Sequence, residues 1–433
     1  MKNLNGNSEN RGVAVFFISD INSFKQRSLL WAQQYSIVAA LDNNLNKNQL
    51  YQSNEFLLAV GAKDEIPESN NCFSAIHDFF NKSNEWKFGF LCYDIKNEIE
   101  DLQSNNEEQL KFPLTHFFNP ETLIRITGSE AEIISSHKNV TEIFYEINSV
   151  SISEKHTSLF PEIKTTMPDE DYLMKVEKIK EYITEGDVYE LNLCREFYCE
   201  NYKCDPLQLY FKLNETSLAP YSVFYKLHSK YLLCASPERF LKKDATKIIS
   251  QPIKGTIRRS EDEQMDIQLR SKLLNSEKDR TENVMIVDLV RNDLSRSCVA
   301  GSVIVEELFG IYTYPKVHQM VSTVCGDLRN EIAISDALKN AFPMGSMTGA
   351  PKIRAMQLID ELENSKRGLF SGAVGYITPE NDFDFNVVIR SILYDAENKY
   401  LSFSAGGAIT IDSNPQSELE EILLKTEAVR NIL

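Results

Sequence analysis

The sequence lacks long apolar runs, and this absence excludes a protein that spans a membrane with helices. The longest apolar stretches are short, such as Val13 to Ile18, whereas a helix that crosses a bilayer needs about 20 mostly apolar residues. The N-terminal stretch MKNLNGNSEN is polar and contains no apolar segment of the kind found in a secretory signal. We therefore expect a cytoplasmic protein that does not associate with membranes.

Histidine is rare, and the cysteines show no paired spacing. The 433 residues include six histidines and eight cysteines, with no CxxC pair and no group of histidines near a cysteine. Structural zinc sites depend on such groups, so we expect no zinc site. Thiols in a reducing compartment stay free, and we interpret all eight cysteines as packing residues.

Positive charge is also in short supply. The chain has 46 Lys and Arg residues against 63 Asp and Glu residues, which gives a formal net charge of −17. Such a chain does not attract nucleic acid or an anionic membrane surface over a distance. An anionic substrate would therefore need locally placed lysines and arginines, or a bound cation, to hold it.

Composition changes once along the chain and divides it into two parts. Apolar residues make up 42% and charged residues 25% of the sequence, which are the proportions of a globular protein. Residues 1–160 are rich in Asn, Ser and Phe, whereas residues 165–433 have denser apolar patterning. We expect an N-terminal region over 1–160 and a catalytic region over 165–433.

The spacing of apolar residues predicts both strands and helices. Short apolar runs predict buried strands over 13–18 and 56–60. Apolar residues recur every three or four positions over 171–185 and a glycine follows, which predicts a helix that ends at Gly186. One or two helices are expected over 270–296. Strands and helices mix without a βαβ repeat, which indicates an α+β or mixed α/β fold with large sheets.

Two motifs contain candidate catalytic side chains. In QPIKGTIRR, Lys254 lies in an apolar turn before a glycine. If this lysine is buried, desolvation lowers its pKa and makes it a candidate nucleophile, and otherwise it is a surface residue. In CASPERF, Glu238 follows a proline at the end of an expected strand. It is either a partly buried general acid or a solvated turn residue.

Acidic residues recur in two expected helices. Glu282 precedes an apolar helix face in KDRTENVMIVDLVRND, and Glu418, Glu421 and Lys425 share one face of the helix expected over 417–433. Glu282 and Glu421 are candidate ligands for Mg²⁺, which prefers carboxylate oxygens. The alternatives are a glutamate that stabilises the first turn of its helix and a ladder of surface ion pairs.

Two glycine-containing stretches are candidate anion sites. In SAGGAIT, the two glycines allow backbone N–H groups to approach an anion, although a bulge or a tight turn has the same sequence signature. In FPMGSMTGAPKIRAMQLIDEL, a loop leads into an amphipathic helix with Pro351 in its first turn. The N-terminus of such a helix can face an anion.

Taken in order, these motifs resemble one family, the chorismate-utilising enzymes. The family includes anthranilate synthase component I, aminodeoxychorismate synthase component I, and the isochorismate and salicylate synthases. The resemblance covers about residue 165 to the end, with a weaker likeness around GFLCYD in the N-terminal part. The matching runs are GDVYELNL, SPERF, PIKGTIRR, KDRTENVMIVDLVRNDLSR, VHQMVSTV, FPMGSMTGAPKIRAMQLIDELE, GAVGYI, DFNVVIRS, SAGGAI and SELEE followed by Lys425.

The resemblance implies a two-subdomain α/β sandwich of mainly antiparallel sheets flanked by helices, and a site that uses Mg²⁺. It places the metal ligands at Glu282 and Glu421, with Glu418 nearby through water, and the general acid/base at Glu238. The motifs also contain the residues implied to contact the substrate carboxylates or to line the site: Arg390, Tyr376, Lys425, Gly406, Gly407, Thr348 and His318. The run AGGA departs from the common AGGG at Ala408, which leaves the backbone amides in place.

Lys254 distinguishes the branches of this family. PIKGT is typical of the aminodeoxychorismate synthases, whereas the anthranilate and isochorismate branches typically have Ala at this position. The isochorismate and salicylate synthases also use a lysine base in the strand after GD, and we assign that position to Asn192. The resemblance therefore implies conversion of chorismate and ammonia to 4-amino-4-deoxychorismate, a precursor of 4-aminobenzoate and folate, through a covalent adduct on Lys254.

The same resemblance implies a partner that supplies ammonia. The sequence has no cysteine in a Gly-x-Cys-x-Gly elbow and no His-x-Glu pair near its end, so a separate glutaminase subunit is expected. Two alternatives stay open. One is anthranilate synthase component I, which has the same fold, and the other is an inactive paralogue that acts as a binding or regulatory subunit. The second is disfavoured by four intact residues, Glu238, Lys254, Glu282 and Glu421.

Overall fold

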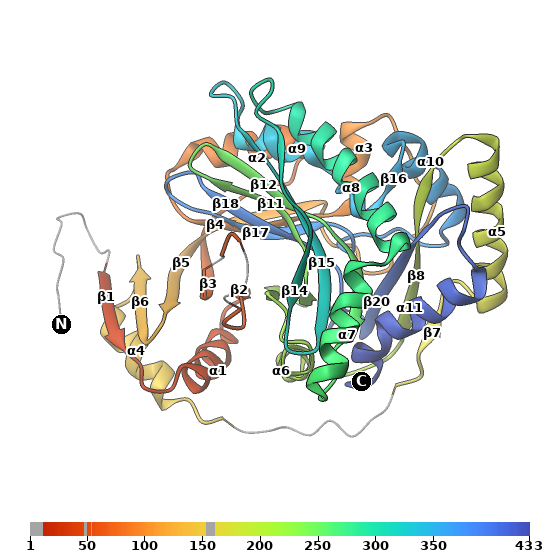
Figure 1. Cartoon of the computed structure of the whole chain (residues 1–433). Coiled ribbons are helices and arrows are strands. Elements are labelled where there is room, and N and C mark those ends of the chain that lie inside the picture. Colours follow the sequence, from red (N-terminus) through yellow and green to blue (C-terminus); the bar gives the residue numbers. More distant parts are fainter. Residues whose placement is uncertain (1–11, 47–49, 53, 153–160) are drawn as a thin grey trace.

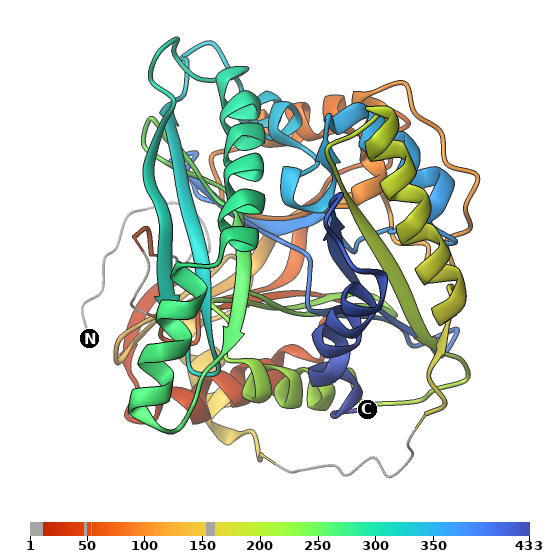
Figure 2. The ribbon, with the colours of Figure 1, turned by 45° about the vertical axis from the view of Figure 1, so that its right-hand side comes forward.

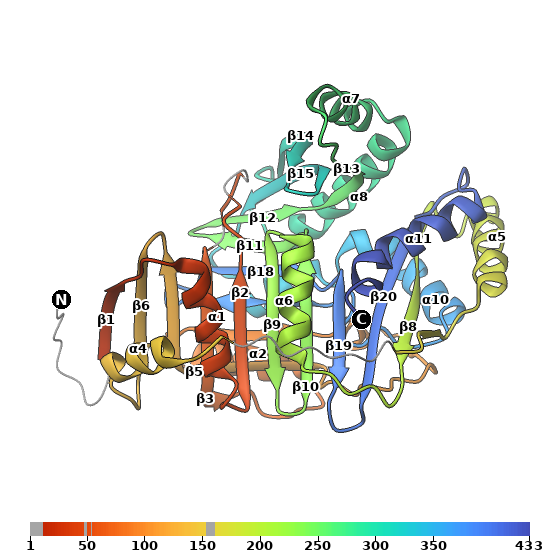
Figure 3. The same ribbon diagram turned by 90° about the horizontal axis from the view of Figure 1, so that it is seen from below.

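Two large antiparallel sheets form the protein. The computed structural model describes residues 12–46, 50–52, 54–152 and 161–433 (Figure 1). The first sheet runs from the edge strand β1 to β8, and Figure 3 shows its strands side by side. In spatial order its strands are β1 (Gly12–Phe17), β6 (Glu130–Ser135), β5 (Thr115–Thr127), β3 (Phe56–Glu65), β2 (Ile37–Asp42), β9 (Tyr221–Leu227), β10 (Lys230–Ser236), β19 (Ser391–Asp395), β20 (Tyr400–Ile409) and β8 (Glu190–Cys199), with the short β7 (Lys164–Thr165) and β16 (Gly349–Ala350) on the far side of β8.

The second sheet branches from the first at β5. Residues 115–118 of β5 pair with β4, whereas residues 122–127 pair with β6, so β5 belongs to both sheets. From β5 the order is β4 (Lys87–Leu91), β17 (Ala373–Ile377), β18 (Phe383–Val387), β11 (Arg239–Asp244), β12 (Lys247–Gln251) and β15 (Val317–Asp327), with β13 (Ile253–Arg258) continuing along β15 beyond β12 and β14 (Ile304–Thr313) on the other edge of β15.

Helices cover the outer faces of the sheets. Figure 3 shows α1, α4 and α6 over the first sheet, and α11 packs on β20 beside α5. The helices are α1 (Ile21–Ala32), α2 (Cys72–Lys82), α3 (Lys96–Ile99), α4 (Val140–Ser149), α5 (Asp169–Glu185), α6 (Pro206–Ser217), α7 (Glu263–Leu274), α8 (Glu277–Ser295), α9 (Ile334–Ala341), α10 (Lys352–Leu362) and α11 (Pro415–Arg430), with short 3₁₀ turns η1 (Tyr93–Ile95) and η2 (Gly345–Met347). Within the described ranges, no helix has the length and apolar character needed to cross a membrane.

The central strands of the first sheet, such as β2, are buried on both faces. On β2, Ile37 and Ala39 belong to the core between the sheets, whereas Val38 and Ala40 belong to the core under the outer helices. Successive side chains of a strand point to opposite faces, so a continuous apolar run is what such a strand requires. This explains why the sequence shows apolar runs rather than strict alternation.

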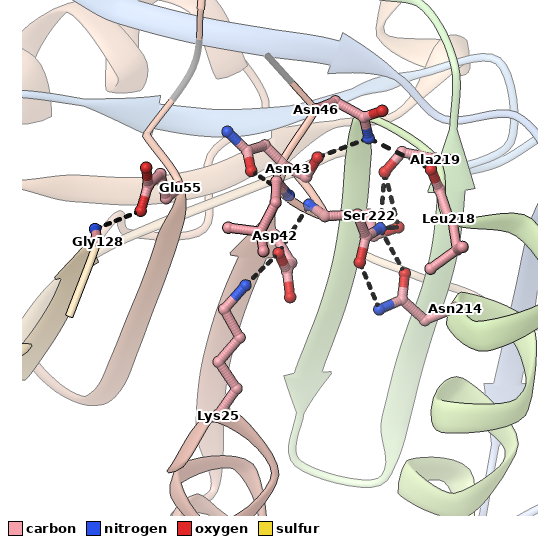
Figure 4. A network of polar contacts seen from close by, with 12 residues as sticks. Lys25, Asp42, Asn43, Asn46, Glu55, Gly128, Asn214, Leu218, Ala219 and Ser222 are labelled. Atoms are coloured by element: carbon pink, nitrogen blue, oxygen red, sulfur yellow. Dashed lines mark hydrogen bonds and ion pairs between the residues drawn. The ribbon is translucent and has the colours of Figure 1, made fainter. Parts of the chain in front are cut away.

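A polar network ties β2 to its neighbours (Figure 4). The Lys25 ammonium on α1 donates to Asp42 at the end of β2, with 2.8 Å between Nζ and Oδ1. Beyond the strand, the Asn46 amide donates to the Asn43 carbonyl at 2.7 Å and to the Leu218 carbonyl at 3.3 Å. The N-terminal part of the chain is therefore fixed against α6 and β9.

Most of the expected elements are confirmed. The α+β fold with mainly antiparallel sheets is present, and the helix expected over 171–186 is α5, which ends at Gly186 with a φ of 87°. The segment 270–296 forms parts of two helices, α7 and α8. The expectation of a buried strand over 13–18 is wrong in one respect, because β1 is an edge strand with Phe17 73% exposed.

Strands from both parts of the chain pair directly. β2 pairs with β9, and β4 pairs with β17. Each sheet therefore contains strands from both sides of residue 160. The division into an N-terminal region and a catalytic region stays a prediction.

Candidate active site

Lys254 lies in a buried position on β13, beside the strand β8. Its side chain is 10% exposed, and its Nζ donates to Glu190 Oε1 at 3.0 Å. The next residue, Gly255, has a φ of +88°, and a Cβ added there would lie 2.9 Å from the Asp279 side chain on α8. Only glycine fits both conditions without strain. The glycine that follows Lys254 thus allows β13 to pass close to α8.

Three carboxylates surround the Lys254 ammonium. Burial alone would lower its pKa, but the charges of Glu190, Glu282 and Glu238 outweigh burial and raise the pKa of Lys254 above its ordinary value. Desolvation alone therefore does not decide the charge of this lysine, because the neighbouring carboxylates act in the opposite direction. Lys254 can act as a nucleophile only after it passes its proton to another group.

Glu238 meets the requirements of a general acid. It follows Pro237 between β10 and β11, is 5% exposed, and accepts a hydrogen bond from the Ser346 hydroxyl at 2.6 Å. Burial raises the pKa of Glu238 to about 7, against the opposing effects of Ser346 and Lys254. A carboxyl group with this pKa is protonated in a large fraction of molecules at neutral pH.

Glu282 lies in the second turn of α8, because α8 begins at Glu277. The alternative of a glutamate in the first turn of its helix is therefore wrong. It is 7% exposed, and burial raises its pKa to about 7. Its Oε1 atom is buried and has no hydrogen-bond partner among the described residues. A buried carboxylate oxygen without a partner is costly unless a cation or a proton reaches it.

The acids of α11 approach Glu282 through a shared lysine. Lys278 Nζ lies 3.8 Å from Glu282 and 3.2 Å from Glu418 Oε1, and Glu418 is 2% exposed. Glu421 pairs with Lys425, with 2.6 Å between Oε1 and Nζ, and this lysine lowers the pKa of Glu421. We refer to Glu190, Glu238, Glu282, Glu418 and Glu421 as the acid cluster.

The acid cluster has the donor chemistry for a divalent cation. Carboxylate oxygens are the ligands that Mg²⁺ prefers, and Glu282 Oε1 has no hydrogen-bond partner among the described residues, with the Lys278 ammonium 3.8 Å away. Within the part of the chain that the structure describes, no three acidic, histidine or cysteine side chains are already arranged around a common metal position. Lys278 instead supplies the positive charge between Glu282 and Glu418.

Backbone groups of β20 and β8 form the floor of the site. Gly406 lies opposite Cys194, and a Cβ added to Gly406 would lie 2.5 Å from Asn192 Oδ1. Asn192 in turn donates its amide to the Ser346 carbonyl, and its backbone N–H donates to the Thr348 carbonyl. A Cβ at Gly407 would lie 3.3 Å from Glu418. The AGGA run therefore lies inside a strand, where glycine allows close contact with the acids.

The buried side chain of Arg367 links the backbone segments that form this floor. Its guanidinium donates to the Met347 carbonyl at 2.6 Å and to the Asn192 carbonyl at 2.9 Å, and it pairs with Glu363. Glu363 also accepts from the Cys194 N–H at 2.8 Å. The buried arginine therefore fixes β8 and the η2 loop relative to each other.

An open cleft of about 670 Å³ leads toward the site. Its lining residues come mainly from α6, β13, β15 and α11, and Figure 2 shows α7 and α8 opposite α11. Arg390 and Lys425 line the cleft, and Arg390 donates to the Lys425 carbonyl at 2.9 Å. The basic residues that line it are Arg258, Arg259, Lys316, Arg390 and Lys425. Local positive charge is thus present in a chain of net negative charge.

The structure does not bring Tyr376 and His318 into this cleft. The Tyr376 hydroxyl accepts from the Asn54 amide at 2.7 Å and lines a separate small cavity. His318 faces α7, with 3.0 Å between its Nε2 and Asp266 Oδ1. These two positions stay predictions, and nothing in the geometry favours them as substrate contacts.

Two residues were missed by the sequence analysis. Gln319 lines the cleft and has a buried Oε1 atom without a partner among the described residues. It adjoins His318 on β15, and alternation along a strand places neighbours on opposite faces. Glu190 precedes Asn192 by two residues and therefore shares its face of β8. The signal for Glu190 was an acid in a strand that is buried on both faces.

Comparisons with known proteins agree with the motifs. The profile of the chorismate binding enzyme family matches residues 21–431. Aminodeoxychorismate synthase component 1 of Escherichia coli (strain K12) is 37% identical over 344 residues, which cover 79% of this chain and 75% of that protein. Anthranilate synthase component 1 of Saccharolobus solfataricus is 33% identical over 349 residues, with 80% of each chain covered. The crystal structure of anthranilate synthase component I from Streptococcus pneumoniae TIGR4 superposes with a TM-score of 0.76 and 25% identity, covering 89% of this chain and 95% of that one.

Proposed function

This chain belongs to the chorismate binding enzyme family, and we propose that it converts chorismate and ammonia to 4-amino-4-deoxychorismate. The relative of that activity in Escherichia coli is 37% identical, whereas the anthranilate synthase relative is 33% identical. The observation that carries the proposal is Lys254, a buried lysine between Glu190, Glu238 and Glu282. The product is a precursor of 4-aminobenzoate and folate.

The chemistry is a double displacement at the ring of chorismate. The amine of Lys254, once deprotonated, attacks C2, the ring double bond shifts, and the C4–O bond breaks. Glu238 gives its proton to the leaving oxygen, which departs as water. Ammonia then attacks C4, the double bond shifts back, and the C2–N bond to the lysine breaks. The ammonium formed at C4 returns one proton to Glu238 and so restores the acid. The enolpyruvyl group stays on the ring.

The carboxylates of chorismate require cationic and N–H donors. Arg390 and Lys425 line the cleft, and the N–H groups around Gly406 and Gly407 lie beside them on β20. The Arg390 guanidinium is anchored through one nitrogen to the Lys425 carbonyl. Its other N–H groups are the donors that we assign to a substrate carboxylate, because a guanidinium binds a carboxylate in a bidentate manner.

Glu282 and Glu421, with Glu418 nearby, are the residues that would hold Mg²⁺. The cation would withdraw electron density from the ring carboxylate and so favour the loss of the 4-hydroxyl. The buried Glu282 Oε1 atom, which has no hydrogen-bond partner among the described residues, supports this assignment.

Ammonia is proposed to come from a separate glutaminase subunit. The name of the Escherichia coli relative, component 1, implies a second component. We expect glutamine alone to support no turnover by the purified chain. Sustained turnover with glutamine in a preparation shown by mass spectrometry to contain one polypeptide would contradict this.

The test is product analysis with the purified chain, chorismate, Mg²⁺ and an ammonium salt. Mass spectrometry should detect aminodeoxychorismate, which retains the enolpyruvyl group. Anthranilate and pyruvate as main products would instead identify an anthranilate synthase. The absence of either product in the presence of bound chorismate would support an inactive paralogue.

A further inference from the structure

The role proposed for Lys254 raises the question of where its proton goes. The carboxylates around this lysine keep it in the ammonium form, and an ammonium has no lone pair with which to attack. A proton acceptor must therefore lie within hydrogen-bond reach of Nζ. Among the described residues, one acid meets this requirement. Glu190 accepts from Lys254 Nζ at 3.0 Å and is 1% exposed.

Glu238 is poorly suited to accept this proton. Its carboxyl group is bound to the Ser346 hydroxyl at 2.6 Å. It must also hold its own proton until the ring oxygen leaves, because that oxygen departs as water. A Glu238 that already carries this proton cannot accept a second one, and among the described residues no hydrogen bond joins it to Lys254.

The second oxygen of Glu190 strengthens the case. Glu190 Oε2 is buried and has no hydrogen-bond partner within the described part of the chain. An anionic carboxylate in this position lacks the donors that would stabilise it, apart from Lys254. Transfer of one proton from Lys254 converts a buried ion pair into a neutral amine and a neutral acid, so no net charge is created in the interior.

We propose that Glu190 is the catalytic base that takes the proton from Lys254. The Nζ–H bond breaks and an O–H bond forms on Glu190, and the freed lone pair attacks C2. When the C2–N bond breaks in the second displacement, the lysine leaves as a neutral amine and recovers its proton from Glu190. The pair is thus restored in each cycle without exchange with solvent. This inference rests on the proposed function.

Other charged groups face this pair from each neighbouring element. Glu282 and Lys278 approach from α8, Glu421 approaches from α11, and Glu238 approaches from the turn after β10. Within the described residues, Lys254 has no ion pair with Glu282 or Glu238, which lie beyond ion-pair distance. Loss of the Glu190 carboxylate therefore leaves Lys254 still surrounded by acids and still charged near neutral pH.

The central test is Glu190→Gln, which keeps the shape of the side chain and removes its basicity. Turnover should be measured from pH 6 to 9 with the concentration of free NH₃ held constant by adjusting the ammonium salt. We expect kcat to fall about 10²-fold at the acidic end and the loss to shrink as the pH rises, because hydroxide then takes the proton. The KM for chorismate should not change. Glu190→Asp should give a smaller loss with the same pH trend.

The matched control is Glu196→Gln, the same change on the same strand, β8, at a position that lines another cavity. It should retain the kcat and pH profile of the parent. Equal losses in both variants would assign Glu190 a merely structural role and overturn the proposal. So would a kcat for Glu190→Gln that matches the parent at every pH.

A second measurement does not depend on product identity. The reaction of Lys254 with an amine-modifying reagent can be followed against pH by the mass of its peptide. Loss of Glu190 should move the half-point of modification down by about one pH unit or more, because an opposite charge has been removed. An unmoved half-point would show that the two groups do not share a proton. If the parent makes anthranilate while the half-point moves, the proposed function fails and the ion pair stands.

Discussion

The open cleft and the acid cluster behind it hold opposite charge. The cleft is lined by five basic residues and by Glu427 as its one acid among the described lining residues. The acid cluster contains five glutamates, with Lys254 and Lys278 between them. Arg258 and Glu427 form an ion pair between β13 and α11. The two regions meet at Lys425, which lines the cleft and pairs with Glu421.

This contrast shows how a chain of net negative charge can bind an anion. The basic residues of the cleft face the carboxylates of the substrate, whereas the buried acids control protons and are suited to a cation. Electrostatic interactions are stronger in the acid cluster than in the cleft, because charges in the interior are screened far less than charges at the surface. Substitutions inside the cluster should therefore have larger effects than substitutions at the cleft.

The largest effect is expected at Lys254. Lys254→Ala and Lys254→Arg should both reduce aminodeoxychorismate formation by on the order of 10³-fold or more, because neither side chain can form the adduct and a guanidinium stays protonated. Both variants should still bind chorismate. A mass increase on the Lys254 peptide of the parent would detect the adduct. A Lys254→Arg variant with parental turnover would exclude the covalent route.

The metal-binding acids should come next. Glu282→Gln and Glu421→Gln each remove an anionic ligand while nearly keeping the volume. We expect the Mg²⁺ concentration for half-maximal activity to rise about 10- to 100-fold, as measured by titration with Mg²⁺ at saturating chorismate. Parental turnover of either variant at limiting Mg²⁺ would remove that residue from the metal site.

Glu238 should affect stability in a pH-dependent way. Its pKa is raised from 4.5 to about 7 in the folded protein, so the folded state binds the proton more tightly than the unfolded chain. Its contribution to stability is present at low pH and is lost as the pH rises toward and beyond 7. Glu238→Gln cannot ionise, so at pH 8 it should be more stable than the parent by about 1–3 kcal/mol, and at pH 4 it should show no such gain. Denaturant unfolding at both pH values measures the difference, and a gain of the same size at both would place its origin elsewhere.

The smallest effect is expected at the cleft. Lys316 is a basic residue of the lining, and Lys316→Gln should lower kcat/KM for chorismate by about two- to fivefold at low ionic strength. Salt should abolish the difference. Lys203→Gln, an exposed lysine outside the lining, is the control. An equal loss in the two variants, or a loss that persists in high salt, would mean that the cleft does not attract the substrate through charge.

The sequence predicted the fold, and its motifs contain most of the charged residues that the structure gathers around Lys254. The charge of Lys254 influences the pKa of Glu238, and Lys278 lies between Glu282 and Glu418. The sequence does not show which face of a strand meets the cleft. Successive side chains of a strand point to opposite faces, so Gln319 lines the cleft while His318 faces α7.

The sequence also does not show which group meets a buried acid. Glu190 lies in a run that is buried from end to end over 190–195, and its partner Lys254 is 64 residues away in sequence. Only the folded structure shows that these two charges meet. The pKa of Lys254 depends on the contact with Glu190, so the direction of its pKa shift could not be predicted from burial alone.

The shared strand β5 has a consequence for how the chain can be divided. One half of β5 completes the first sheet and the other half completes the second, and β2 and β4 pair with strands from the later part of the chain. A fragment that ends near residue 152 would expose the hydrogen-bonding edges of β2 and β4. A fragment that begins near residue 161 would expose the matching edges of β9 and β17. The two parts therefore complete each other's sheets, and we expect neither fragment to keep its strands paired without the other.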